Sequence, residues 1–320
     1  MLRYGSLSRM ASMGRVLCLA SAAAFGAMAI FGKLAYDEGA NAGTLLAVRF
    51  VLAAGVLWGV LLARGEMRTL RALPRRDVTI ALGLGTCGYA LQAGCYFTAL
   101  QRIDASLLSL LLYTFPAIVT VAAVALGRER LDRSRVLALG LVSIGLTLVL
   151  AGAGTGALEG VGVALGLGAA CVYSTYILVS DGVARRVPAL TLATLVCTGA
   201  AVSLTVGSTA FGQFHPGALT AAGWGWLACL AVVSTVGAIA LFFAGLARVG
   251  PTSASILSTV EPLVTVALAS VVFAERLSAE QLAGGALVLA AVLVLRTHRA
   301  AEPVSERALH PAPAATLASG

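Results

Sequence analysis

The sequence predicts an all-α polytopic membrane protein, in which ten transmembrane helices form two inverted five-helix repeats around a central cavity. Three observations predict this fold. Hydrophobic residues make up 59% of the 320 residues and charged residues only 11%, whereas soluble domains hold ~45–50% apolar residues with glycine included. The apolar residues gather in segments of helix length, and part of the chain recurs.

Ten segments have the length of about 20 mostly apolar residues that a membrane-spanning helix needs. We place them at 16–36, 42–63, 78–100, 104–126, 136–153, 160–180, 189–211, 218–246, 252–273 and 279–296. The first segment follows several arginines as a secretory signal does, but its apolar run is too long for one. We therefore expect a retained first helix after a cytoplasmic tail, residues 1–15, and a disordered cytoplasmic tail at residues 297–320.

Residues 96–150 align with residues 242–296 at a constant offset of 146, and 12 of these 55 positions are identical. Glu129-Arg130-Leu131 returns as Glu275-Arg276-Leu277. Equivalent helices lie five apart, an odd number, so the two copies must cross the membrane in opposite directions. We assign the first repeat to residues 16–153 and the second to residues 160–296. Inverted repeats of this kind are typical of secondary transporters.

The net charge of +8 reports orientation rather than a nucleic-acid partner. If the chain starts in the cytoplasm, only Arg102 and Arg276 of the 22 Lys and Arg residues fall in external loops. Lys33 and Arg49 lie within the first two helices, and all others are on the cytoplasmic side. This bias predicts that both termini are cytoplasmic. Lys33, near the end of the first helix, is expected to extend outward to the membrane surface.

The ninth segment carries the one acidic residue in the middle of a predicted span. Glu261 lies roughly 15 Å from either end of its helix, where a charge costs about 2.5–3.5 kcal/mol on insertion scales. Pro262 removes the backbone hydrogen bond to the carbonyl of Ser258, so we expect a hinge. We interpret Glu261 as a cavity residue that binds a cationic group, a proton or both. The alternative is a structural carboxylate, hydrogen-bonded between helices.

Other segments supply candidate cavity walls. Pro116 repeats the kink of Pro262, with Phe115 in the place of Glu261. Tyr89, Gln92 and Tyr96 share one helix face because residues three and four apart are neighbours, although tyrosines also anchor helices at the membrane surface. The sixth segment adds Tyr173, Ser174 and Tyr176. The candidates for substrate binding or coupling are Glu261, Arg49, Gln92, Tyr96, Tyr89, Tyr113, Ser258 and Thr259, with Pro116 and Pro262 as structural hinges.

Arg49 lies roughly 10 Å inside the predicted outer surface. It could pair with a substrate carboxylate, with Glu261 or with carbonyl groups of a neighbouring helix. Alternatively, its long side chain reaches the surface.

Nothing in the sequence supports catalysis, because no nucleophile–base set, metal-ligand spacing or phosphate loop occurs. We expect no enzymatic activity, no metal and no cofactor. The run Gly83-Leu-Gly-Thr-Cys-Gly88 spells a dinucleotide-binding pattern but lacks the preceding strand. The six cysteines fall inside predicted spans and are interpreted as small apolar fillers. Small residues are expected to let helices approach closely at Gly55-x-x-x-Gly59, Gly162-x-x-x-Gly166 and Gly284-Gly285.

Four stretches together resemble the EamA-type transporters of the drug/metabolite transporter superfamily. They are Ala47-Val-Arg-Phe50, Tyr96-Phe-Thr-Ala-Leu100, Pro116 with Gly127-Arg-Glu-Arg-Leu131, and Glu261-Pro262 with Ala274-Glu-Arg-Leu277. The resemblance covers residues 16–296. Phe25-Gly26 departs from it, because relatives commonly have Trp-Gly there.

The resemblance implies a ten-helix inverted-repeat fold and transport of a small metabolite, often the export of amino acids or related compounds across the bacterial inner membrane. Arg49 and Glu261 match family motif positions. We predict a secondary transporter that works by alternating access, with a small-molecule substrate, the lipid bilayer and protons as partners; the oligomeric state stays open. The alternative is a non-transporting membrane scaffold or subunit.

Overall fold

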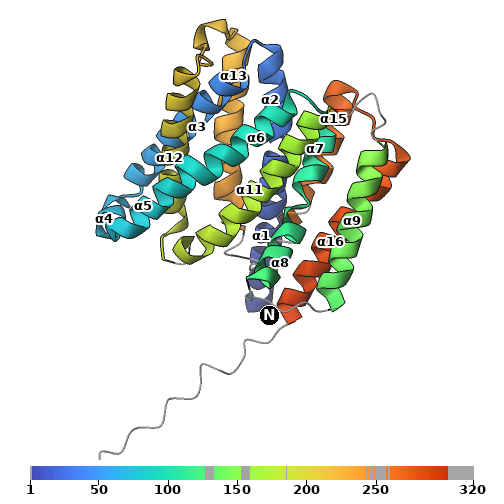
Figure 1. The fold of residues 1–320 in the computed structure, drawn as a ribbon. Coiled ribbons are helices and arrows are strands. Elements are labelled where there is room, and N and C mark those ends of the chain that lie inside the picture. The colour runs from blue at the N-terminus through green and yellow to red at the C-terminus, as the bar shows by residue number, and fades with distance from the viewer. Residues whose placement is uncertain are drawn as a thin grey trace, which may run out of the picture.

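The computed structural model describes residues 2–126, 133–152, 159–184, 186–242, 244–245, 248, 257–258 and 260–301. Every regular element in these ranges is a helix, and most helices run between the same two ends of one bundle (Figure 1). Eight helical stretches are long and apolar enough to cross a membrane. Two shorter apolar helices, Val260–Phe273 and Ala279–Val294, lie where we predicted the ninth and tenth spans. This is the architecture of a polytopic membrane protein.

The helices divide at the link between the predicted repeats. The first half contains α1 (Leu2–Gly26), α2 (Met28–Asp37), α3 (Ala42–Ala63), α4 (Met67–Ala72), α5 (Arg75–Gly83), the π-helical turn η1 (Leu84–Tyr89), α6 (Ala90–Leu100), α7 (Ala105–Leu112), α8 (Phe115–Ala125) and α9 (Arg133–Gly152). The second half contains α11 (Gly160–Ala184), α12 (Ala189–Ala210), the 3₁₀ turn η2 (Pro216–Ala218), α13 (Ala221–Ala231), the π-helical turn η3 (Val232–Gly237), α15 (Val260–Phe273) and α16 (Ala279–Ala301). Each half therefore has one π-helical turn inside its third spanning helix.

Both predicted tails are partly helical. α1 begins at Leu2, and α16 continues to Ala301. The prediction of disorder from residue 297 is therefore wrong for residues 297–301, where arginine and alanine favour helix. Residues 302–320 lie outside the described part of the chain.

Contacts between the halves come in matching pairs. Between the two halves, α3 packs on α12, and α9 packs on α16. The contact of α6 with α11 has its counterpart in α13 with α2, and that of α8 with α11 has its counterpart in α15 with α1. These last two contacts of α11 thus recur between helices that lie five places further along the chain.

The crossing of α9 and α16 depends on two glycines. A Cβ on Gly145 would lie 2.7 Å from the carbonyl oxygen of Gly284, and a Cβ on Gly284 would meet the Gly145 carbonyl. At the offset of 146, the equivalents of Gly145 and Gly284 are Ala291 and Ala138. Both alanines are fully buried in one apolar cluster. The two helices therefore meet through small residues at two equivalent places, as the small-residue pattern predicts for helices in lipid.

The other two predicted small-residue patterns have different outcomes. Gly162 and Gly166 contact Ile103 and Leu108 of the first half, so close approach there is confirmed. Gly55 and Gly59 have no atom within 4 Å of an added Cβ among the described residues, so the prediction of close packing on that face of α3 is wrong. That face is open because α3 packs on α12 with its other side.

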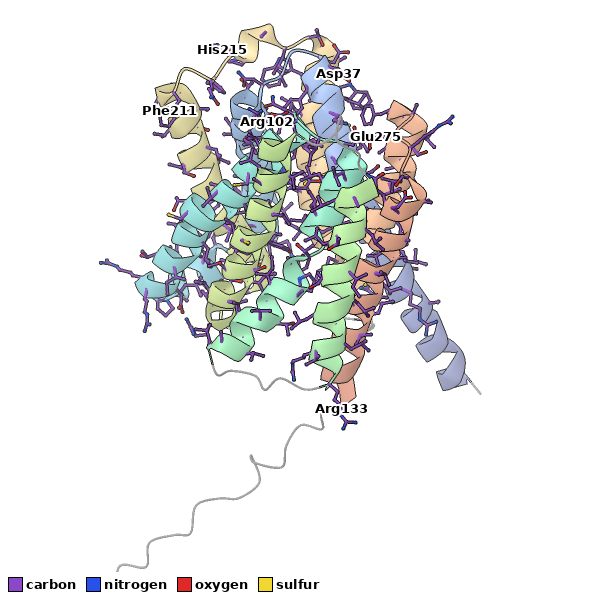
Figure 2. All side chains as sticks on the ribbon, turned by 45° about the vertical axis from the view of Figure 1, so that its right-hand side comes forward. Asp37, Arg102, Arg133, Phe211, His215 and Glu275 are labelled. Carbon is purple, nitrogen blue, oxygen red and sulfur yellow. The ribbon has the colours of Figure 1, made fainter. Side chains whose placement is uncertain are left out.

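Ion pairs join distant segments at both ends of the bundle. Figure 2 shows Arg102, His215 and Glu275 at one end and Arg133 at the other. At the Glu275 end, Lys33 Nζ lies 2.7 Å from Glu275 Oε1. The prediction that Lys33 extends to the surface is therefore wrong, because a carboxylate from the loop after α15 is within reach. At the opposite end, Arg186 donates to the buried Asp77 at 2.7 Å, which ties the loop after α11 to α5.

We expect Gly145→Ala to lower thermal stability in detergent, because its methyl group would collide with the backbone of α16. Overpacking of this kind costs about 1–3 kcal/mol. Gly140→Ala on the same helix is the matched control, since nothing lies within 4 Å of a Cβ there. Equal melting temperatures for the two variants, measured by differential scanning fluorimetry, would contradict the assigned crossing.

Candidate functional site

A cavity with a volume of about 120 Å³ lies in the interior of the bundle. Its wall is polar and aromatic and draws on helices of both halves. It is lined by Phe25, Met28, Arg49, Tyr89, Gln92, Tyr96, Phe97, Leu112, Tyr113, Phe115, Tyr173 and Glu261. Six of the eight predicted site residues thus line one cavity. Ser258 is not part of this lining, although its carbonyl accepts a hydrogen bond from the lining residue Tyr113, and Thr259 lies outside the described residues.

The cavity lies beside a break in the fourth spanning helix and beside the first turn of α15. The fourth spanning helix stops at Leu112, and α8 begins at Phe115 with Pro116 in its first turn. The described part of α15 begins at Val260, and Pro262 lies in its first turn. Non-helical backbone is tolerated at membrane depth only where protein or a cavity surrounds it. The break in the fourth helix, flanked by Leu112 and Phe115, and Glu261 of α15 therefore meet at the cavity.

Tyr113 satisfies the backbone that Pro262 leaves unpaired. Proline has no N–H, so the carbonyl four residues earlier, that of Ser258, loses its helical partner. The Tyr113 hydroxyl lies 3.0 Å from this carbonyl oxygen and 3.0 Å from Glu261 Oε2. One phenol proton is thus shared between a freed carbonyl and a carboxylate, which links the break in the fourth helix to the start of α15.

Glu261 is half-buried and lies directly beside the first helix. The Thr265 hydroxyl donates to the carbonyl of Gly26 at 2.9 Å. A Cβ on Gly26 would lie 2.8 Å from the Glu261 carbonyl oxygen, so only glycine allows this approach. Phe25, which precedes it, lines the cavity. The Phe25-Gly26 pair singled out in the sequence therefore shapes the wall next to the acidic group.

Arg49 is 2% exposed and is held without a carboxylate. Its Nε donates to Thr235 Oγ1 at 3.1 Å, and its NH2 lies 3.1 Å from Met28 Sδ. The guanidinium also lies over the rings of Phe50 and Phe97, 4.9 and 5.2 Å from their centroids. Within the described residues no ion pair reaches Arg49. A guanidinium is always charged, so an anion in the cavity would be favoured.

Aromatic rings form an unbroken path between the two charged groups. Phe50 contacts Tyr89, and the path continues through Tyr176, Tyr173 and Phe115 to Tyr113, with ring centroids 4.8–6.3 Å apart. The Tyr–Phe contacts are edge-on, an arrangement aromatic pairs prefer. Four of these rings, Tyr89, Tyr173, Phe115 and Tyr113, line the cavity together with Arg49 and Glu261.

Sequence reasoning did not identify Thr235 or the apolar wall residues. Thr235 belongs to η3, where its hydroxyl also donates to the Leu230 carbonyl five residues earlier. A π-helical turn changes which residues share a face, so helical spacing could not place it. Met28, Phe97 and Leu112 carry no signal that distinguishes a cavity wall from ordinary core.

The chain was compared with known proteins. The sequence model of the EamA-like transporter family matches it twice, at residues 12–151 and 160–297. A protein of Bacillus subtilis (strain 168) described as the uncharacterized transporter YcbK is 26% identical over 284 residues, which cover 86% of this chain and 90% of that protein.

A solved crystal structure of a protein is similar with a TM-score of 0.62 and 19% identity, covering 91% of this chain and 99% of that chain. At this identity the likeness shows the fold alone. The two family matches together span nearly all of the described helices. The chain belongs to the EamA-like transporter family, within the drug/metabolite transporter superfamily.

Proposed function

We propose that this protein is a secondary transporter that moves a small, amino-acid-like metabolite across the bacterial inner membrane by alternating access. One observation carries the proposal: a single interior cavity holds Arg49 from one half and Glu261 from the other. A zwitterion offers a carboxylate to the guanidinium and an ammonium group to the carboxylate, and both would form charge-assisted hydrogen bonds. Membership of a transporter family and the similarity to YcbK support transport.

Alternating access rests on the relation between the two halves. The family matches the chain twice, and the contacts of α11 with α6 and α8 have counterparts in those of α13 with α2 and α15 with α1. Together with the odd helix spacing in the sequence, this supports an inverted repeat. Two inverted halves can exchange conformations, which provides an inward-open and an outward-open state of similar energy.

The small size of the cavity also supports a conformational change during transport. Its volume of about 120 Å³ is below the roughly 300–1,000 Å³ of typical ligand pockets. A metabolite therefore needs a more open conformation to enter and leave. With both termini in the cytoplasm, as the arginine distribution predicts, the Glu275 end faces outward.

Arg49→Gln should weaken binding of a carboxylate ligand by about tenfold or more, since a hydrogen bond to a charged group contributes ~1.5–3 kcal/mol. The measurement is a thermal-shift titration of the purified protein with a panel of L-amino acids and their methyl esters. If an amino acid raises the melting temperature of the wild type, its methyl ester should not do so. Arg102→Gln, in an exposed pair with Glu159, is the control. Unchanged affinity in Arg49→Gln would refute the assignment.

Glu261→Gln should remove the pH dependence of transport in proteoliposomes, because glutamine keeps the shape of the side chain but carries no titratable proton. Tyr113→Phe is the comparison, as it removes the hydroxyl and leaves the carboxylate. Transport by Glu261→Gln that still follows pH as in the wild type would exclude proton coupling through this residue.

The scaffold alternative is tested by a cysteine at Gln92, which lines the cavity. The four native cysteines that are not fully buried (Cys87, Cys95, Cys171 and Cys229) are first replaced by alanine. We expect a charged, membrane-impermeant thiol reagent to label Gln92→Cys from one side of the membrane. Absence of labelling from both sides would favour the scaffold.

A further inference from the structure

We propose that α7 and α15, joined at both of their ends, form the gate that closes the cavity toward the Glu275 end, and that the contents of the cavity control it through Tyr113 and Glu261. The proposal rests on the proposed function, and it identifies the moving part and its link to the site. α7 belongs to the first half and α15 to the second, and they pack on each other.

The first joint lies at the Glu275 end, away from the cavity. The Glu275 carboxylate accepts hydrogen bonds from the backbone N–H groups of Ala105 and Ser106, at 3.1 and 3.0 Å, and from the Ser106 hydroxyl at 2.7 Å. The first amides of a helix have no partner within it. Asp104 precedes α7 but forms no capping hydrogen bond with its side chain. A residue of the opposite half therefore caps α7.

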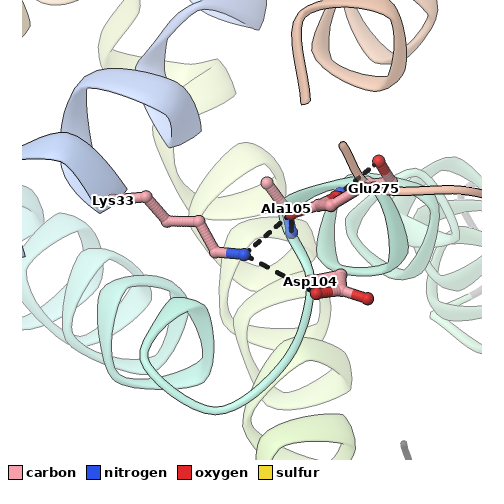
Figure 3. Close-up of polar contacts among 5 residues, drawn as sticks. Lys33, Asp104, Ala105 and Glu275 are labelled. Atoms are coloured by element: carbon pink, nitrogen blue, oxygen red, sulfur yellow. Dashed lines mark hydrogen bonds and ion pairs between the residues drawn. The ribbon is translucent and has the colours of Figure 1, made fainter. Parts of the chain in front are cut away.

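Lys33 adds the first helix to this joint. Its Nζ donates to Glu275 Oε1 at 2.7 Å, lies 3.7 Å from Asp104 Oδ1, and lies 5.2 Å from the centroid of the Phe273 ring. Figure 3 shows Lys33 reaching toward Asp104 and Glu275 at the start of α7. Three segments that are far apart in the sequence (α2, the start of α7 and the loop after α15) thus meet at one carboxylate.

At this joint the Glu275 carboxylate stays charged and is held in a fixed position. Burial raises the pKa of Glu275, but the hydrogen bonds from Lys33 and Ser106 outweigh it and hold the pKa below its usual value. Glu275 is therefore ionised at neutral pH. Ala274 just before it has a φ of 55°, a left-handed conformation uncommon for a residue with a Cβ. Such strain persists where the surroundings impose it, often at switch regions.

The second joint lies at the cavity, where Tyr113 bonds Glu261 and the Ser258 carbonyl. α7 covers roughly 12 Å between the two joints at 1.5 Å per residue, and Tyr113 follows its last residue. A ligand that takes Glu261 as its partner competes with the phenol. Occupancy of the cavity therefore weakens the joint at Tyr113, and the joint at Glu275 then carries more of the connection between α7 and α15.

The test measures access rather than transport. Gln92→Cys, in the background with four cysteines replaced, is labelled in intact cells by a membrane-impermeant thiol reagent. We expect Glu275→Gln to raise the labelling rate by about tenfold, since loss of a hydrogen bond to a charged group shifts a closed–open equilibrium by roughly that much. Lys33→Met, which leaves the Ser106 bonds in place, should give a smaller rise. Tyr113→Phe should also raise it.

Arg102→Gln is the matched control, because the exposed Arg102–Glu159 pair lies at the same end of the bundle but does not join α7 to α15. If Glu275→Gln does not fold, Lys33→Met and Ser106→Ala carry the test. Wild-type labelling rates in these variants and in Tyr113→Phe would overturn the gate. Absence of labelling from either face in every variant would instead refute the proposed function, so the two failures are distinguishable.

Discussion

The hydroxyl of Tyr113 is the contact on which the centre of this protein depends. In lipid every backbone polar group must find a partner within the protein, and Pro262 removes the N–H that would bond the Ser258 carbonyl in a regular helix. The phenol supplies the partner and at the same time contacts the carboxylate of Glu261. The break in the fourth helix is thus held against α15, beside the cavity.

The frame around this contact is nearly symmetric, while its chemistry is not. Pro116 and Pro262 occupy equivalent places, and each half has a π-helical turn inside its third helix. At the position of Glu261, however, the first half has Phe115, whose ring continues the aromatic wall. One half thus supplies the carboxylate, the other supplies Arg49 and Tyr113, and two related scaffolds enclose a cavity with a charged group of each sign.

The sequence was sufficient to predict the helices and their order, because long apolar segments are easily recognised. It also predicted most of the cavity wall, because an acidic residue and a proline within an apolar segment are conspicuous. Lys33 shows the limit of such reasoning. An isolated lysine near a helix end is expected to reach water, and only the tertiary structure reveals Glu275 from a loop 242 residues later. The contact of Thr235 with Arg49 could not be predicted either, since a π-helical turn changes which residues share a helix face. Gly55 and Gly59 had the right pattern but no neighbouring helix.

The separation of Arg49 from Glu261 follows from these same contacts. A direct ion pair between them would neutralise the cavity and compete with any charged ligand. Thr235 and Met28 instead hold the guanidinium from one side, with the rings of Phe50 and Phe97 beneath it, and Tyr113 holds the carboxylate from the other. Each restraint comes from backbone irregularity: a π-helical turn places Thr235, and a broken helix places Tyr113. The irregular turns that cost the fold its regular hydrogen bonding are therefore what position Arg49 and Glu261 on the wall of one cavity.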